Sequence, residues 1–152
     1  MFLSKKISSI LILFLVLVDQ LSKFWAREYL KLAIRADFIP SFLEFKYAEN
    51  TGMAFSFLAS QPFILTILIS IINLGLLFYF LKEVQPPLFL IFIFAGAFSN
   101  LLDRYFFGFV TDFINPIFMN FAIFNLADVF LNIGLAFYIL DTIFSGTAPK
   151  DE

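Results

Sequence analysis

The chain of 152 residues contains neither cysteine nor histidine. The absence of cysteine excludes disulfides, thiolate metal sites and a cysteine nucleophile. The absence of histidine excludes a Ser-His-Asp triad and the HExxH zinc motif. Any hydrolytic chemistry must therefore use aspartate, glutamate, serine, lysine or water.

Charge is also scarce, since 14% of the residues are charged and the formal net charge is −2. We expect no nucleic-acid partner, because such binding requires a basic surface. Hydrophobic residues make up 61% of the chain, whereas a soluble domain has about 45–50%. A chain this short cannot bury so many apolar side chains in one core surrounded by water. The composition therefore indicates a membrane protein, in which phenylalanines face lipid.

Four long apolar segments predict an all-α polytopic membrane protein with four transmembrane helices. A helix needs about 20 mostly apolar residues to cross the hydrocarbon layer, and residues 7–25, 62–81, 87–106 and 121–144 meet this requirement. Lys5-Lys6 before the first segment is typical of a signal peptide, but no small-x-small cleavage site follows. We interpret the segment as an uncleaved span, and residues 1–152 as a single integral membrane domain.

Residues 26–61, between the first two spans, are too polar to form another span. Residues 42–48 alternate, with Leu43, Phe45 and Tyr47 on one side and Glu44 and Lys46 on the other, which predicts a half-buried β-strand. Asn50-Thr51-Gly52 predicts a turn, and residues 53–58 favour a strand or a short helix. We expect a small extramembrane module that contains β-structure.

Lysine and arginine indicate how the spans are oriented. With four spans, both termini lie on one side of the membrane. A raw count of basic residues opposes a cytoplasmic N-terminus, because the first loop contains many of them. Acids nearly balance that loop, however, and Lys5-Lys6 directly precedes the first span, which usually dominates orientation. We therefore expect both termini in the cytoplasm.

Acids and amides inside the spans mark a candidate site, because an acid at mid-helix costs about 2.5–3.5 kcal/mol. At a rise of ~1.5 Å per residue, Asp19 lies about 18 Å from the terminus-side end of its span. Asn100 and Asp103 lie about 20 and 24 Å from theirs. Asn125 and Asp128 lie about 6 and 10 Å below the opposite start of the fourth span. All five therefore fall in the leaflet opposite the termini.

Asp112 is expected in a loop at the same edge. Asn100 with Asp103, and Asn125 with Asp128, have the i, i+3 spacing that places two residues on one helix face, so each helix is expected to present an amide beside an acid. Two close carboxylates cannot both ionise easily, so one keeps a proton. The ionised one can take a proton from water while the other protonates the scissile carbonyl, which is aspartic peptidase chemistry without a metal or cofactor.

Alternative interpretations apply to several residues and to the function. Asp19 has a second interpretation, in which it only bonds a neighbouring helix. Asp141 is expected at the interface near the termini, and Asn73 in helix packing. Acids on several helices also line ion paths, so a small membrane transporter or proton-conducting protein is an alternative. An assembly factor that binds partner helices is another.

Five motifs over nearly the whole chain resemble those of bacterial lipoprotein signal peptidase, also called signal peptidase II, an aspartic peptidase family. They are Asp19-Gln-Leu-Ser-Lys23, Glu49-Asn-Thr-Gly-Met-Ala-Phe55, Gly96-Ala-Phe-Ser-Asn-Leu-Leu-Asp-Arg104, Gly108-Phe-Val-Thr-Asp-Phe-Ile114 and Phe124-Asn-Leu-Ala-Asp128. Each motif alone is weak, but their order, spacing and placement on four spans make the resemblance specific.

The resemblance implies an enzyme that removes the signal peptide from diacylglyceryl-modified prolipoproteins, cutting just before the lipidated cysteine. It implies a catalytic dyad of Asp112 and Asp128. Other positions that it implies in substrate binding or dyad support are Asp19, Lys23, Asn50, Gly52, Asn100, Asp103, Arg104, Asn125 and Ala127. It also implies the bacterial cytoplasmic (inner) membrane, an active site near the extracytoplasmic face, contact with membrane lipids, and globomycin as inhibitor. A monomer suffices, since all motifs lie in one chain.

Three residues depart from the family pattern. Ser99 stands where glycine is usual, Thr111 where valine is common, and Met53 where alanine is common. Serine is small enough for close helix contact, so we expect Ser99 to be tolerated. The interval from Asp112 to Asp128 is short, which leaves the size of the third loop open.

Overall fold

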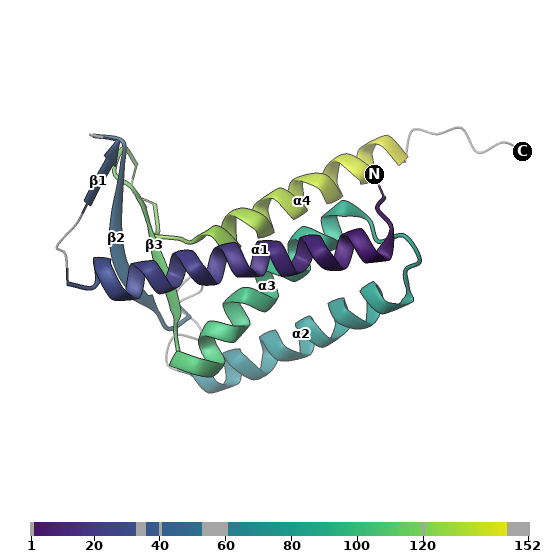
Figure 1. Cartoon of the computed structure of the whole chain (residues 1–152), viewed down its shortest axis with the longest axis horizontal. Coiled ribbons are helices and arrows are strands. Elements are labelled where there is room, and N and C mark those ends of the chain that lie inside the picture. The colour runs from purple at the N-terminus through teal and green to yellow at the C-terminus, as the bar shows by residue number, and fades with distance from the viewer. Residues whose placement is uncertain (1, 33–35, 40, 53–60, 120, 146–152) are drawn as a thin grey trace, which may run out of the picture.

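The computed structural model describes residues 2–32, 36–39, 41–52, 61–119 and 121–145, so Met53 and the element expected at 53–58 lie outside the described residues. Four helices form a bundle, and a small sheet lies at one end of it (Figure 1). The helices are α1 (Lys5–Trp25), α2 (Pro62–Lys82), α3 (Leu88–Phe107) and α4 (Leu126–Ser145). The N-terminus and the end of α4 lie at the end of the bundle opposite the sheet (Figure 1).

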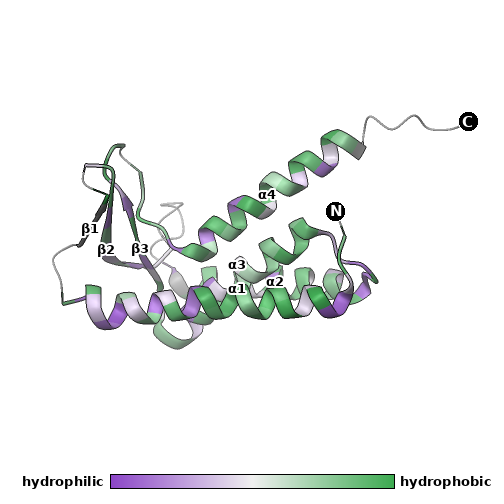
Figure 2. Ribbon diagram, turned by 45° about the horizontal axis from the view of Figure 1, so that its top comes forward, coloured by the Kyte–Doolittle hydropathy of each residue, from purple (hydrophilic) through white to green (hydrophobic). Residues whose placement is uncertain are grey.

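All four helices are long and apolar enough to cross a membrane, which confirms the four predicted spans. Figure 2 shows that hydrophobic residues dominate the helices. Among the described side chains of α2, only Asn73 and Phe80 are buried, so most of its apolar surface faces outward. A helix of this kind is stable where lipid replaces water, and the chain is therefore a multi-pass membrane protein.

Two helix starts differ from the sequence interpretation. α1 begins at Lys5, and it continues beyond Trp25 as a π-helical turn, η1 (Ala26–Leu30). α4 begins at Leu126, five residues after the start expected at 121. The delay arises because Phe124 pairs with β3: its N–H donates to the carbonyl oxygen of Ile114 at 3.0 Å, and it accepts from the N–H of Ile114 at 2.8 Å.

The sheet contains β1 (Ala36–Ile39), β2 (Leu43–Asn50) and β3 (Val110–Pro116), paired antiparallel in that order. β2 confirms the strand expected between the first two spans. β3 was missed, and Asp112 lies in this strand, not in a loop. Residues 110–113 are all buried, so the strand lacks the alternation by which a half-buried strand is recognised.

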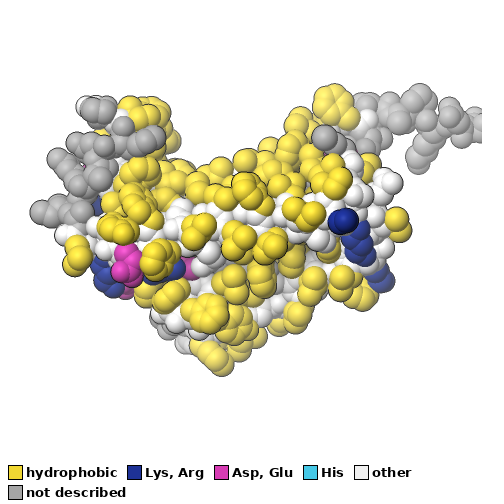
Figure 3. Space-filling view, viewed as in Figure 1, with side chains coloured by type: hydrophobic (Ala, Val, Ile, Leu, Met, Phe, Trp, Pro, Cys, Tyr) yellow, Lys and Arg dark blue, Asp and Glu magenta, His cyan; other side chains and the backbone are white. Residues whose placement is uncertain are grey.

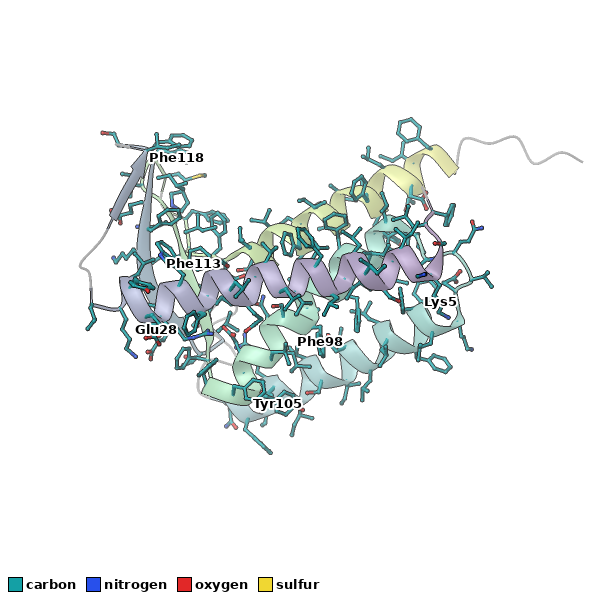
Figure 4. The ribbon with its side chains drawn as sticks, in the orientation of Figure 1. Lys5, Glu28, Phe98, Tyr105, Phe113 and Phe118 are labelled. Atoms are coloured by element: carbon teal, nitrogen blue, oxygen red, sulfur yellow. The ribbon has the colours of Figure 1, made fainter. Side chains whose placement is uncertain are left out.

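Aromatic side chains hold the sheet against the end of α1. The Trp25 ring meets the Phe45 and Phe113 rings edge-to-face, with centroids 5.4 and 6.4 Å apart. Figure 4 shows Phe113 at the sheet end of the molecule and Lys5 at the opposite end. Glu44, expected on the polar side of β2, is buried and accepts a hydrogen bond from Asn115 Nδ2 at 2.6 Å. Glu44 is therefore paired with a polar side chain of the neighbouring strand.

Candidate active site

Asp112 of β3 and Asp128, in the first turn of α4, line one pocket of about 850 Å³. The end of β2, the extended segment before α4 and one side of α4 form its walls. The other lining residues are Ala48, Glu49, Asn50, Phe121, Ala122, Ile123, Phe124, Val129, Asn132, Ile133 and Ala136. Most of these side chains are apolar, so the two carboxylates lie where an unsatisfied charge would be costly.

Each of the two carboxylates accepts two hydrogen bonds from amides. Asp112 accepts from Asn50 Nδ2 at 2.8 Å and from Asn125 Nδ2 at 2.6 Å. Asp128 accepts from Asn100 Nδ2 at 2.9 Å and from the backbone N–H of Asn125 at 3.1 Å. Asn125 therefore contacts both acids and fixes their relative position.

The spacing of Asn125 and Asp128 reflects the start of a helix and not a shared helix face. Because α4 begins at Leu126, Asn125 precedes the helix as its cap. The Asp128 N–H donates to Asn125 Oδ1 at 3.0 Å, while the Asp128 carboxylate accepts the Asn125 N–H. This reciprocal pair is a capping box. Helix capping thus places the Asp128 carboxylate at the N-terminal end of α4.

Asn100 lies on α3, as predicted, but it orients an acid on another helix. Its Nδ2 donates to Asp128, and its Oδ1 accepts from Lys23 Nζ at 2.7 Å and from Asn125 Nδ2 at 3.2 Å. Since lysine can only donate, the Asn100 oxygen must face Lys23 and its NH₂ group must face Asp128. The carboxylate that Asn100 orients is therefore Asp128 of α4.

A buried ion network supports the two acids from within the bundle. The fully buried Lys23 ammonium lies 2.8 Å from Asp19 Oδ2 and 3.7 Å from Asp103 Oδ2. Asp19 also accepts the N–H of Ala127 at 2.8 Å, where the start of α4 favours a negative charge. Asp103 accepts the N–H of Thr111 at 2.8 Å. The network thus joins α1, α3, α4 and β3 without lining the pocket.

Four further residues complete the network, although the sequence interpretation did not assign them to the site: Gln20, Arg27, Ser99 and Thr111. Ser99 Oγ donates to Asp19 Oδ2 at 2.7 Å and accepts from Gln20 Nε2 at 3.0 Å. Arg27 Nη1 donates to Thr111 Oγ1 at 2.9 Å. Two of the three departures from the family pattern, Ser99 and Thr111, therefore add hydrogen-bonded hydroxyls. Arg27 follows Lys23 by four residues, the spacing that places two side chains on one helix face, and this was the signal that could have found Arg27.

Close helix packing brings α3 and α4 together beside the acids. A Cβ atom on Gly96 would lie 2.5 Å from the carbonyl oxygen of Ala127. A Cβ atom on Gly134 would lie 2.6 Å from Ile93 Cγ1. Small residues at such positions allow two helix backbones to approach closely. This approach lets Asn100 reach Asp128.

The turn after β2 orients Asn50. Gly52 has φ of +128°, a conformation that side chains disfavour, and its N–H donates to Asn50 Oδ1 at 2.9 Å. That bond leaves the Asn50 NH₂ group facing Asp112. Arg104 Nη1 donates weakly to the Asn50 carbonyl oxygen at 3.5 Å. Gly52 and Arg104 therefore contact the site through Asn50.

Glu49 also lines the pocket, but its carboxylate is bound at the surface. It accepts hydrogen bonds from Lys31 Nζ at 3.0 Å and from the Tyr47 hydroxyl at 2.9 Å. These two bonds hold the pKa of Glu49 below its usual range. Glu49 therefore stays ionised and is poorly suited to exchange protons with a ligand.

Burial and, after it, the charge of Asp128 raise the pKa of Asp112 to about 6. Hydrogen bonds from Asn50 and Asn125 and the charge of Lys23 oppose this rise. A carboxyl with such a pKa exchanges protons near neutral pH, and two interacting carboxyls titrate as a pair. The pair can therefore present one acid and one base to the same bond.

Fold and site together define a membrane-embedded aspartic hydrolase. The model of a family described as signal peptidase (SPase) II matches residues 11–144. The chain therefore belongs to the signal peptidase II family, and it is an aspartic peptidase.

Curated relatives and solved structures agree with this assignment. The chain is 37% identical over 136 residues to a lipoprotein signal peptidase of Streptococcus agalactiae serotype V, covering 86% of this chain and 88% of the relative. It is 33% identical over 143 residues to one of Streptococcus pyogenes serotype M2, covering 91% and 93%. Two solved structures of bacterial membrane enzymes, 32% and 33% identical, superpose with TM-scores of 0.85 and 0.80. Each superposition covers 97% of this chain; it covers 93% of the first solved chain and 95% of the second.

Proposed function

We propose that this peptidase removes the signal peptide from diacylglyceryl-modified prolipoproteins, cutting just before the lipidated cysteine, with Asp112 and Asp128 as the catalytic dyad. One observation carries the proposal: both carboxylates line the same largely apolar pocket and are bridged by Asn125. The names of the relatives supply the substrate class, since they are lipoprotein signal peptidases.

The two carboxylates divide the chemistry of peptide hydrolysis between them. The ionised carboxylate takes a proton from a water molecule, whose oxygen attacks the scissile carbonyl carbon. The protonated carboxyl gives its proton to the carbonyl oxygen, which neutralises the tetrahedral intermediate. When the intermediate collapses, the C–N bond breaks and the new amine of the lipidated cysteine takes a proton from the dyad. No covalent enzyme intermediate forms.

The pocket suits a substrate that carries acyl chains. Its wall on α4 is formed by Val129, Ile133 and Ala136, and Ile133 is 36% exposed. A lipid-bearing peptide can therefore enter laterally from the membrane and leave its acyl chains against apolar side chains. Globomycin, the inhibitor implied by the family, is expected to block the same pocket. All the groups needed belong to one chain, so a monomer is the expected active unit.

We place the enzyme in the bacterial cytoplasmic membrane, with both termini in the cytoplasm and the dyad near the extracytoplasmic face. Support comes from β3 and the start of α4, which carry the dyad and lie at the end of the bundle opposite the N-terminus (Figure 1). A reporter fused after Glu152 should be read as cytoplasmic. A periplasmic signal would contradict this topology and indicate the opposite orientation.

A transporter is not favoured. Among the described residues, the buried charged side chains are Asp19, Lys23, Glu44, Asp103 and Asp112. Two belong to the sheet, and the others belong to the last third of α1 or α3, toward the ends that lead into the sheet. An ion path requires polar groups through the full depth of the membrane.

The decisive experiment incubates the purified protein in detergent with a diacylglyceryl-modified prolipoprotein and follows the loss of the signal peptide. Asp112→Asn and Asp128→Asn should each abolish cleavage. Glu28→Gln, at an exposed acid outside the pocket, should leave cleavage unchanged. Normal cleavage by either aspartate variant would contradict the dyad. No cleavage by the folded, unmutated protein would contradict the proposed function.

A further inference from the structure

An apolar stripe on α4 leads from the dyad to the opposite end of the bundle. Val129, Ile133, Ala136, Leu140 and Phe144 are spaced four, three, four and four residues apart, so they lie on one helix face. The first three line the dyad pocket, and the last two line a second pocket of about 350 Å³. None of the five is buried, and Phe144 is 70% exposed. The stripe therefore joins the two pockets along an uncovered face.

The shape of the molecule leaves room for a partner along this side. In Figure 3, the surface is hollowed between the sheet end and the far end of α4, and hydrophobic side chains cover the hollow. An extended apolar surface of this kind suits a helix that lies in the membrane beside α4.

The second pocket contains one charged side chain, Asp141. Its other lining residues are Pro87, Leu88, Phe89, Phe137, Leu140 and Phe144, which are all apolar. Asp141 is half-buried, and within the described part of the chain its carboxylate forms no hydrogen bond or ion pair. A carboxylate in apolar surroundings favours a cationic partner. The pocket thus combines an apolar wall with an acceptor for a basic group.

The distance between the dyad and Asp141 matches the dimensions of a signal peptide. Asp141 follows Asp128 by thirteen residues of α4, which corresponds to about 20 Å at the rise of an α-helix. A signal peptide has a basic n-region, then an apolar stretch of about 7–15 residues, then the cleavage site. As a helix, that stretch spans about 10–22 Å. A basic residue before it therefore reaches Asp141 when the scissile bond lies at the dyad.

We propose that the signal peptide of the substrate lies along the α4 stripe and that Asp141 binds the basic side chain of its n-region. The inference rests on the proposed function, and it assigns to Asp141 a role in choosing substrates. Because Asp141 is remote from the reacting atoms, its ion pair stabilises the bound substrate and the transition state equally. Loss of such a contact raises KM and leaves kcat nearly unchanged.

The test uses two synthetic diacylglyceryl-modified substrates, which differ only in lysine or glutamate in the n-region. Asp141→Asn should raise KM for the lysine substrate by about two- to fivefold, the effect expected for a partly exposed ion pair. Asp141→Lys should reverse the preference and cleave the glutamate substrate better. Glu83→Gln removes an acid at the same end of the bundle, outside the second pocket, and should change neither KM.

Comparing two substrates on one enzyme separates binding from loss of folding. Equal KM values for both substrates on the unmutated enzyme would overturn the role of Asp141. So would an Asp141→Lys variant that loses activity equally on both. Cleavage of neither substrate by the folded, unmutated enzyme would overturn the proposed function itself. A change confined to kcat would also contradict the inference, because it would mean that Asp141 acts on the chemical step.

Discussion

Replacing Asn50 with alanine tests whether the hydrogen bonds around the dyad set its proton affinity. Asn50 Nδ2 donates to Asp112 Oδ2 at 2.8 Å, and this bond opposes the effect of burial, so that the pKa of Asp112 is raised only to about 6. The proposed mechanism needs one proton shared by the dyad, so activity falls as pH rises through that pKa. Removal of the hydrogen bond destabilises the charged carboxylate and raises its pKa. The alkaline limit of activity should therefore move to higher pH.

The size of the shift follows from the strength of the lost bond. A hydrogen bond to a charged group contributes about 1.5–3 kcal/mol, and one pKa unit corresponds to about 1.4 kcal/mol. The alkaline limb for Asn50→Ala should therefore move upward by about one to two pH units. The assay is kcat/KM for a diacylglyceryl-modified substrate from about pH 5 to about pH 9, which reports the pKa values of the free enzyme.

A matched control lies on β3 of the same sheet. Asn115 Nδ2 donates to Glu44 Oε1 at 2.6 Å and has no hydrogen bond to Asp112. Asn115→Ala should therefore lower stability without moving the alkaline limb. An Asn50→Ala profile with an unmoved limb, or with one at lower pH, would refute the reasoning that this amide stabilises the charged form of Asp112.

Two further predictions concern stability, measured as thermal unfolding in detergent. Lys23→Met should lower the free energy of unfolding by about 3–5 kcal/mol, because it leaves the buried Asp19 without a cation and leaves Asp103 with only Arg27, at 3.5 Å; an unchanged melting temperature would contradict the ion network. Gly96→Ala should cost about 1–3 kcal/mol, since its Cβ would lie 2.5 Å from a backbone oxygen. Gly75→Ala, where a Cβ meets nothing within 4 Å, is the control and should be neutral or stabilising.

The membrane spans could be predicted from the sequence because each helix satisfies its own backbone within one apolar segment. The predicted bounds of α2 and α3 differ from the observed ones by a single residue at each changed end. The grouping of polar residues at one depth also followed from helical rise alone. These properties depend on residues close together in the chain.

The strand that carries Asp112 could not be predicted in the same way. β3 exists because it pairs with β2, and the ladder places Ala48 opposite Asp112 across more than sixty residues of chain. The same strand also pairs with Phe124 and so delays the start of α4. Such pairing depends on which segments meet in space, and local patterns do not record it.

The choice of the acid that each amide binds likewise depends on tertiary contacts. Asn100 and Asp103 share a face of α3, yet Asn100 binds Asp128 while Asp103 binds the backbone of Thr111. By itself, the sequence determined four membrane spans, a cluster of acids and amides at one depth, and the residues that resemble a family. Only the tertiary structure decided that Asn125 bridges Asp112 and Asp128. The reason is that spacing along a helix sets a side chain's direction, but packing between helices and strands sets its partner.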